Sequence, residues 1–351
     1  MTIRSKAPVR VDFAGGTTDL SPFREVEGGV VVNAAISRYA YCSLRSTANN
    51  GVRLTSDDLQ QYVEAATIKE LEYDGNLDLV KAAVRRLGLE GGLDIIVRCD
   101  APPGAGTGSS ASVGVALLGA LAELRQMRDH SPPPRMSRHD LADMACELEG
   151  ELGIVGGKQD QYAAALGGIN YMEFYAQGRV AVREIELAPA TVEELEKHLV
   201  LCYSGESRLS GDTNERMISA YRRGEPKVVE ALRTVKRVAQ DVQVALLAGD
   251  LPAFGELLEE ETAARVQLHQ GVMTPAMARL LAAGREAGAI GGKVCGAGGG
   301  GCLLFMSAPD QEGNVRRAVE AAGGRILDFT FDHRGLHVWR RGAERDDRHE
   351  A

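Results

Sequence analysis

Residues 101–112 have the sequence Ala101-Pro102-Pro103-Gly104-Ala105-Gly106-Thr107-Gly108-Ser109-Ser110-Ala111-Ser112. Glycine at every second position from 104 to 108 lets the backbone approach a ligand closely, because no Cβ is in the way. The segment 109–124 is apolar almost all round, which predicts a buried helix with its N-terminus in the interior. Because a helix N-terminus presents free N–H groups and a positive dipole end, the pattern favours a phosphate-binding loop.

The loop is not a Walker A motif, because no Gly-Lys-Ser/Thr sequence follows its glycines. The alternative is a glycine-rich turn closed by a serine cap, without a ligand. The three serines at 109, 110 and 112 favour the phosphate-binding interpretation.

A second glycine cluster occupies residues 293–302, Lys-Val-Cys-Gly-Ala-Gly-Gly-Gly-Gly-Cys. It contains Gly-x-Gly-x-x-Gly at Gly296, Gly298 and Gly301, but a dinucleotide-binding fingerprint needs a helix directly afterwards. Here an apolar strand candidate, 303–306, follows. We therefore expect a tight loop between two strands that approaches a ligand, with a dinucleotide site as the less favoured alternative.

Two carboxylates lie near a pair of glycine doublets. Glu149 falls near the end of a helix that Ser137 caps, and Asp160 falls in the first turn of a short helix bracketed by Gly156-Gly157 and Gly167-Gly168. On their own, Asp160 is better explained as an acid that complements the helix dipole, and Glu149 as part of a solvated helix face.

The composition limits the class of protein. A chain of 351 residues with 44% apolar and 25% charged residues is expected to form a globular protein of two domains. Lys and Arg number 40 against 49 Asp and Glu, a formal charge of −9, which disfavours broad binding to nucleic acid or anionic membrane but permits a small anionic substrate. Six dispersed cysteines without C-x-x-C spacing suggest reduced thiols and no zinc site.

The layout along the chain changes near residue 190, from mainly strands to mainly helices. We place an N-terminal domain at 1–190, a C-terminal domain at 191–340 and a charged, frayed tail at 341–351. Strands are predicted at 29–36, 39–44, 180–187 and 325–331, among others. The N-terminus lacks an apolar signal region and no apolar run approaches 18 residues, so we expect a cytoplasmic protein.

Three segments resemble, in order and spacing, the three motifs of the GHMP kinases, the family of galactokinase, homoserine kinase, mevalonate kinase and phosphomevalonate kinase. They are residues 7–20, 102–112 and 293–302. Within the family the sequence is most similar to the D-glycero-D-manno-heptose 7-phosphate kinases, through 13–20 and 157–162. It departs from galactokinase, which has Glu-His where this chain has Gly16-Thr17, and from the heptose kinase pattern, which tends to have a further glycine at Thr17.

The resemblance implies an α+β, two-domain GHMP kinase fold, with an N-terminal domain like the second domain of ribosomal protein S5 and a ferredoxin-like C-terminal domain. ATP and sugar would bind in the cleft between them. The phosphates of ATP would lie on Pro103, Gly104, Ala105, Gly106, Thr107, Gly108, Ser109 and Ser110. Ser110 and Glu149 would ligate Mg²⁺, Asp160 would be the base, and Arg10 the cation beside it. The substrate-binding residues would be Thr18, Asp19, Gly157, Lys158, Gln159, Arg208 and Gly298.

The function that we expect is ATP-dependent phosphorylation of a sugar or sugar-phosphate hydroxyl, foremost the anomeric hydroxyl of D-glycero-D-manno-heptose 7-phosphate, to give the 1,7-bisphosphate. Lys158 and Arg208 are the candidates for holding the acceptor's own phosphate, with solvated surface positions as the alternative. The other functions considered are a galactokinase- or fucokinase-like kinase of a free sugar, a kinase of homoserine or an isoprenoid alcohol, a noncatalytic sugar and ATP sensor, and an NAD-dependent enzyme. No nucleic-acid or membrane partner is expected, and the oligomeric state stays open.

Overall fold

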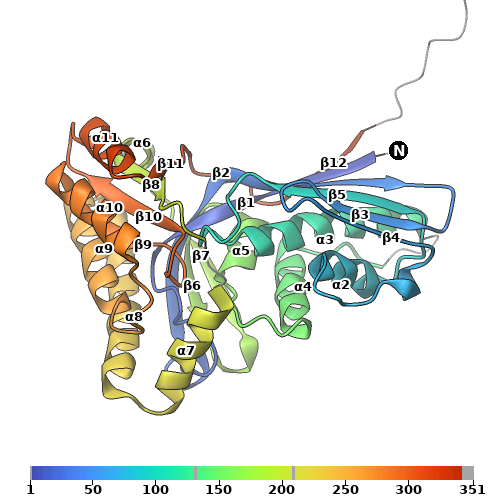
Figure 1. The fold of residues 1–351 in the computed structure, drawn as a ribbon, viewed down its shortest axis with the longest axis horizontal. Helices are drawn as coiled ribbons and strands as arrows, with labels where there is room; N and C mark the ends of the chain where they lie inside the picture. Colours follow the sequence, from blue (N-terminus) through green and yellow to red (C-terminus); the bar gives the residue numbers. More distant parts are fainter. Residues whose placement is uncertain (1, 130–132, 208–209, 342–351) are drawn as a thin grey trace, which may run out of the picture.

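The computed structural model describes residues 2–129, 133–207 and 210–341, which form two lobes, each built on one sheet (Figure 1). Arg208 and all but the first residue of the predicted tail 341–351 lie outside the described residues. The first sheet contains β1 (Thr2–Ala14), β2 (Gly29–Ser46), β3 (Val52–Ser56), β4 (Gln61–Ala65), β5 (Leu93–Cys99), β6 (Ile169–Phe174), β7 (Val180–Glu184) and β12 (His337–Arg341). The second contains β8 (Leu199–Tyr203), β9 (Ala289–Val294), β10 (Cys302–Ser307) and β11 (Arg325–Ile326).

The helices of the first lobe are α1 (Phe23–Val26), α2 (Asp78–Arg86), α3 (Ser109–Arg128), α4 (Arg138–Glu151) and α5 (Gln159–Leu166). The later helices are α6 (Pro189–His198), α7 (Ser210–Arg222), α8 (Pro226–Ala248), α9 (Leu251–Arg265), α10 (Pro275–Glu286) and α11 (Glu312–Ala321). Two short 3₁₀ helices are η1 (Ile68–Glu70) and η2 (Ala176–Gly178). The α+β content and the division into two lobes are as the sequence predicts.

The central hairpin of the first lobe is made by β1 and β2, which differ from the prediction. The two strands expected at 29–36 and 39–44 are one strand, β2, whose pairing with β1 shifts register so that Pro8 faces Tyr39 while Val9 faces Ile36. Such a bulge interrupts the apolar pattern without ending the strand, which explains why the sequence suggested two strands. The strands expected at 180–187 and 325–331 end early, at Glu184 and Ile326.

Helix α3 lies across β1 and β2 and is buried along most of its length, as its apolar sequence predicts. Two buried serine hydroxyls join α3 to β1: Ser112 Oγ of α3 donates to Pro8 O at 2.8 Å, and Ser5 Oγ of β1 donates to Ala116 O at 2.5 Å. These two bonds hold the N-terminal half of α3 beside β1.

The two lobes share a core. One cluster of buried side chains combines β1 and β2 with α8, α9 and β10, so that the second lobe packs directly on the first. The chain then returns to the first sheet, where β12 pairs with β1. The first sheet therefore includes residues 337–341, which follow the predicted C-terminal domain boundary at 190. Arg341 belongs to β12 and not to the predicted tail. The domain boundary at 190 stays a prediction.

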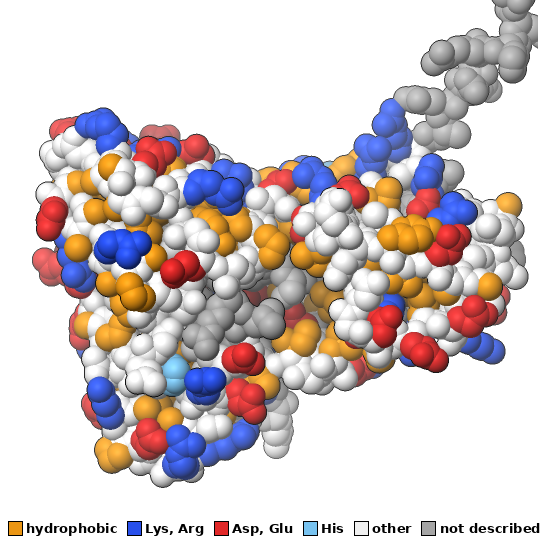
Figure 2. Space-filling view, viewed as in Figure 1, with side chains coloured by type: hydrophobic (Ala, Val, Ile, Leu, Met, Phe, Trp, Pro, Cys, Tyr) orange, Lys and Arg blue, Asp and Glu red, His pale blue; other side chains and the backbone are white. Residues whose placement is uncertain are grey.

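Acidic and basic side chains are interspersed on the face shown in Figure 2, where the surface is hollowed between the lobes. No helix within 2–129, 133–207 and 210–341 is long and apolar enough to cross a membrane. The cytoplasmic location stays a prediction.

Candidate functional site

A cavity of about 240 Å³ lies where the three motifs meet. Its walls come from β1 and the turn after it, the loop before α3, the segment between α4 and α5, and the loop between β9 and β10. The predicted site residues among its lining are Arg10, Asp19, Gly104, Gly106, Gly108, Ser109, Ser110, Glu149, Gly157, Gln159, Asp160 and Gly298. Lining residues that the sequence analysis did not select include Asp12, Thr17, Asn214, Ile154 and Val155.

The loop before α3 depends on its glycines for two reasons. Gly104, Gly106 and Gly108 have φ of +68°, +73° and +73°, a region that L side chains rarely adopt. A Cβ on Gly106 would lie 2.7 Å from Cys295 O, and one on Gly108 would lie 2.9 Å from Asp160 Oδ2. No side chain caps the N-terminus of α3, so its first-turn N–H groups are left for a ligand.

The second glycine loop packs on the first one. A Cβ on Gly296 would lie 2.9 Å from Gly106 O, and the N–H of Cys302 donates to Ala105 O at 2.9 Å. Gly298 has φ +77°, and a Cβ there would lie 2.6 Å from Val272 O. Strand β10 runs antiparallel to β9 with no helix between them, so the dinucleotide alternative is excluded and the predicted loop between strands is confirmed.

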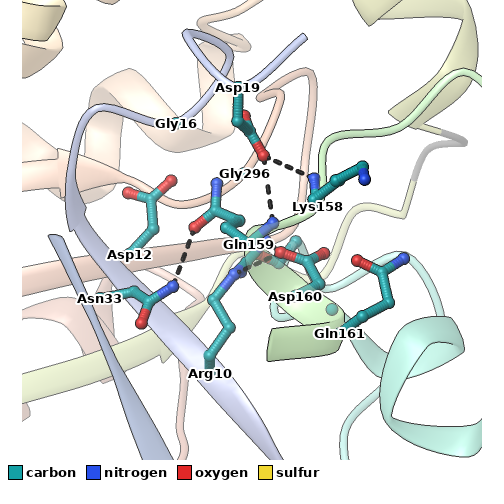
Figure 3. A network of polar contacts seen from close by, with 12 residues as sticks. Arg10, Asp12, Gly16, Asp19, Asn33, Lys158, Gln159, Asp160, Gln161 and Gly296 are labelled. Atoms are coloured by element: carbon teal, nitrogen blue, oxygen red, sulfur yellow. Dashed lines mark hydrogen bonds and ion pairs between the residues drawn. The ribbon is translucent and has the colours of Figure 1, made fainter. Parts of the chain in front are cut away.

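Arg10 and Asp160, which both line the cavity, form an ion pair (Figure 3). Arg10 Nη2 lies 2.7 Å and Nε 2.8 Å from Asp160 Oδ1, while Nη1 donates to Gly106 O at 2.5 Å. The Arg10 side chain is 5% exposed and that of Asp160 is 26% exposed. A buried guanidinium thus holds an accessible carboxylate next to the phosphate-binding loop.

Asp19 forms the opposite wall and joins the first motif to α5. Its Oδ2 accepts from the N–H of Lys158 at 2.9 Å and of Gln159 at 3.2 Å. Burial, with Asp160 nearby, raises the pKa of Asp19. A Cβ on Gly157 would overlap this carboxylate, so glycine is required there. The Asp19 carboxylate and the Gln159 amide therefore present polar groups to an acceptor.

Two of the predicted substrate-binding residues, Thr18 and Lys158, are not among the described residues that line the cavity. Thr18 Oγ1 lies 2.7 Å from Gly15 O and 2.9 Å from Val30 O, inside the turn. Lys158 Nζ donates to Gly178 O at 2.9 Å, so that only the backbone of Lys158 reaches the site. Arg208 is outside the described residues.

Ser110 and Glu149 present a hydroxyl and a carboxylate to the same cavity. Ser110 Oγ donates to Glu149 Oε1 at 3.1 Å, and Gln161 Nε2 donates to Glu149 Oε2 at 2.6 Å. Burial, followed by repulsion from Asp160, raises the pKa of Glu149 to about 7. The Ser110 hydroxyl and the Glu149 carboxylate supply hard oxygen ligands of the kind that Mg²⁺ selects. The described chain has no group of three or more His, Cys, Asp or Glu residues that would form a closed metal site.

The raised pKa of Glu149 gives a prediction for stability. Its folded-state pKa lies above the ordinary 4.5, so the folded protein loses stability as pH rises from about 4.5 through about 7. Without divalent cations, Glu149→Gln is expected to raise the free energy of unfolding at pH 8 by roughly 1–3 kcal/mol, and to change it little at pH 5. Gln161 Oε1 has no hydrogen-bond partner and can accept from the new amide after rotation. Urea unfolding at both pH values measures this; a gain of equal size at both would contradict it.

A buried ionic cluster behind the cavity was missed in the sequence. Lys293 of β9 pairs with Asp12 of β1 and lies 3.6 Å from Glu261, and Arg265 Nε lies 3.0 Å from Glu261 Oε1. All four side chains are fully buried. The one available signal was the presence of Asp12 between Val11 and Phe13, in a strand with apolar neighbours.

Asn214 of α7 was also missed. It lines the cavity, and its Nδ2 donates to Val155 O at 3.2 Å, which ties α7 to the segment before α5. Residues in a long helical stretch without a recognisable motif gave no signal for this contact.

The chain matches known families over both lobes. Residues 77–168 match the family model described as GHMP kinases N terminal domain, and 242–325 match GHMP kinases C terminal. A D-glycero-alpha-D-manno-heptose 7-phosphate kinase of Campylobacter jejuni is 31% identical over 97% of this chain and 99% of that protein. A mevalonate kinase of Pyrococcus abyssi is 30% identical over 70% of this chain and 69% of that protein. The crystal structure of a D-glycero-D-manno-heptose 1-phosphate kinase from Bacteroides thetaiotaomicron has a TM-score of 0.79 at 30% identity, covering 97% of this chain and 100% of that one.

Proposed function

Because this chain belongs to the GHMP kinase family and is an ATP-dependent sugar kinase, we propose that its acceptor is D-glycero-D-manno-heptose 7-phosphate. The reaction makes a bond between the anomeric oxygen and the γ-phosphorus of ATP and breaks the bond from that phosphorus to the β-phosphate oxygen. The products are the 1,7-bisphosphate and ADP, and the proton of the anomeric hydroxyl passes to the enzyme.

The observation that supports this chemistry is the position of Asp160 between the phosphate-binding loop and Asp19. A Cβ on Gly108 of the phosphate-binding loop would lie within 3.0 Å of its carboxylate, and Asp19 lies on its other side. Asp160 accepts the proton of the hydroxyl, and Arg10 keeps the carboxylate oriented. The N–H groups at the start of α3 bind the oxygens of the transferred group.

Ser110 and Glu149 would hold Mg²⁺, whose charge neutralises the β- and γ-phosphate oxygens when it is bound. The chain contributes one hydroxyl and one carboxylate, which fits a cation that keeps water and phosphate oxygens as its other ligands.

Ser110→Ala is expected to raise the Mg²⁺ concentration needed for half-maximal turnover by roughly 10–100-fold and to change the KM of the sugar by less than about twofold. The hydroxyl faces Glu149 rather than the acceptor wall. Ser112→Ala is a control on the same helical turn, because Ser112 donates to Pro8 O in the core. An unchanged Mg²⁺ titration with weaker sugar binding would show that Ser110 faces the acceptor.

The acceptor wall favours a polyol. Asp19 and Gln159 place a carboxylate and an amide against the cavity, and Asn214 adds a second amide. An alcohol with an apolar tail would leave the further hydrogen-bonding capacity of these groups unused, at a cost in binding. The alternatives are a free sugar, which the same wall would accept, and the mevalonate suggested by the second relative.

A coupled assay of ADP release over an acceptor panel tests the proposal. The panel contains the heptose and mannose with and without the terminal phosphate, galactose, fucose and mevalonate. The highest kcat/KM is expected for heptose 7-phosphate. A preference for a free sugar or for mevalonate would overturn the proposed acceptor, and no turnover with any of them would favour a sensor.

Arg208→Ala is expected to raise the KM of the phosphorylated heptose by about 10–100-fold, since a charge-assisted hydrogen bond to phosphate contributes about 1.5–3 kcal/mol. The KM of the unphosphorylated sugar is expected to stay within about twofold. Lys158→Ala is the comparison, because Lys158 Nζ is already bound to Gly178 O. An equal effect of Arg208→Ala on both sugars would contradict a phosphate contact.

A further inference from the structure

The turn that joins β1 to α1 contains a strained residue. Thr17 has φ +81°, in the left-handed region that β-branched residues avoid. Of the non-glycine residues with positive φ in the described chain, Thr17, Gln60, Leu77, Gln177 and Asp310, it alone is β-branched. Such a conformation persists only where surrounding contacts hold it.

The contact that holds it comes from the other lobe. Arg265, at the C-terminal end of α9, donates from Nη1 to Thr17 Oγ1 at 3.1 Å and from Nη2 to Gly16 O at 2.8 Å. The same Nη1 donates to Gly296 O at 2.9 Å. Glu261 accepts from Nε at 3.0 Å and fixes the guanidinium from behind.

These contacts join two walls of the cavity. Gly16 and Thr17 line it from the first lobe and Gly296 lines it from the second lobe. Asp19, two residues after Thr17, carries the carboxylate that accepts from the backbone of α5, beside Asp160. A change in the turn would therefore move Asp19 and the start of α5 together.

We propose that Arg265 is a positioning residue for the acceptor site and that the Thr17 hydroxyl is the contact through which it keeps the strained turn, and with it Asp19, in the binding position. The inference rests on the proposed function only in taking this cavity as the acceptor site. Arg265 does not touch the acceptor, since its side chain is completely buried.

Variants at Thr17 test the proposal, because loss of Arg265 would leave the buried Glu261 with only Lys293, at 3.6 Å, as a cationic partner and would destabilise the core for an unrelated reason. Thr17→Val keeps the strain and removes the oxygen. Thr17→Gly removes both, and Thr17→Ser retains the oxygen. The measurements are the unfolding free energy, the KM of acceptor and of ATP, and hydrogen exchange of peptides covering residues 14–20.

Thr17→Val is expected to be less stable and to raise the acceptor KM about fivefold or more. Thr17→Gly is expected to be at least as stable as the parent protein, and still to raise the acceptor KM and speed exchange in 14–20. The KM of ATP should stay within about twofold in both, and Thr17→Ser should restore the acceptor KM. Asp310→Gly is the control, since Asp310 has φ +62° and its side chain is 90% exposed.

The outcome that overturns the proposal is a Thr17→Gly protein with unchanged acceptor KM and unchanged exchange in 14–20. A general rise in exchange, shared with Asp310→Gly, would also overturn it. Failure of the proposed function is a separate result: heptose 7-phosphate would not be phosphorylated by the parent protein, while the exchange measurement, which needs no acceptor, would still decide the role of Arg265.

Discussion

Asp160→Asn is expected to fold, to bind ATP, and to lose about 10²–10⁴ in kcat, equivalent to roughly 3–5 kcal/mol in the barrier. The amide has the shape of the carboxylate but cannot take the proton of the acceptor hydroxyl. Arg10 keeps its bond to Gly106 O, so the phosphate-binding loop should stay in position. Steady-state kinetics and the ATP-dependent rise in Tm measure the two properties separately.

A matched control is Asp94→Asn, which also neutralises the carboxylate of an Asp–Arg pair. Asp94 Oδ2 lies 2.6 Å from Arg45 Nη2, away from the residues that line the cavity. Normal turnover is expected in this variant. If Asp160→Asn also turned over normally, another group would have to accept the proton and the assignment of Asp160 would be wrong.

Much of the site could be predicted because its residues lie in local patterns. The glycines at 104, 106 and 108 precede an apolar helix, and the structure has α3 starting at Ser109. Ser137 was predicted as a cap, and it forms a capping box with Asp140 at the start of α4. These features depend on neighbours within about ten residues, which is why sequence alone reveals them.

Other features depend on contacts between lobes. Glu261 and Arg265 have the i, i+4 spacing of an ordinary solvent-exposed helix pair. Their burial arises only when α9 packs on the end of β1, which no local pattern shows. The two short strands β3 and β4 were missed for a related reason: in β3 only Val52 and Leu54 are apolar, and the pairing with β5 makes the strand.

The positions of the charged ends of long side chains were the hardest feature of the site to predict from the sequence. Lys158 is two residues from Asp160 in the sequence, yet its Nζ lies on Gly178 O while its N–H binds Asp19. A flexible side chain next to a site in the sequence has many accessible directions, so proximity in the chain does not determine where its charge lies.

The largest combined effect on binding and stability is expected for Gly106→Val. Gly106 has φ +73°, and a Cβ there would lie 2.7 Å from Cys295 O, which is backbone and cannot rotate away. The two glycine loops would separate, and Gly106 O would move from Arg10. We expect kcat/KM for ATP to fall by at least about 10³ and the unfolding free energy by roughly 2–4 kcal/mol.

Gly88→Val separates backbone strain from the clash, because Gly88 has φ +61° with no atom within 4 Å of an added Cβ. It should lose part of the unfolding free energy through strain alone and keep the parent protein's kcat/KM. The difference in kcat/KM between the two valine variants then measures what close packing of the loops contributes to phosphate binding. If Gly106→Val turned over as well as Gly88→Val, the loop before α3 would have only a structural role, and the phosphates of ATP would have to bind elsewhere in the cavity.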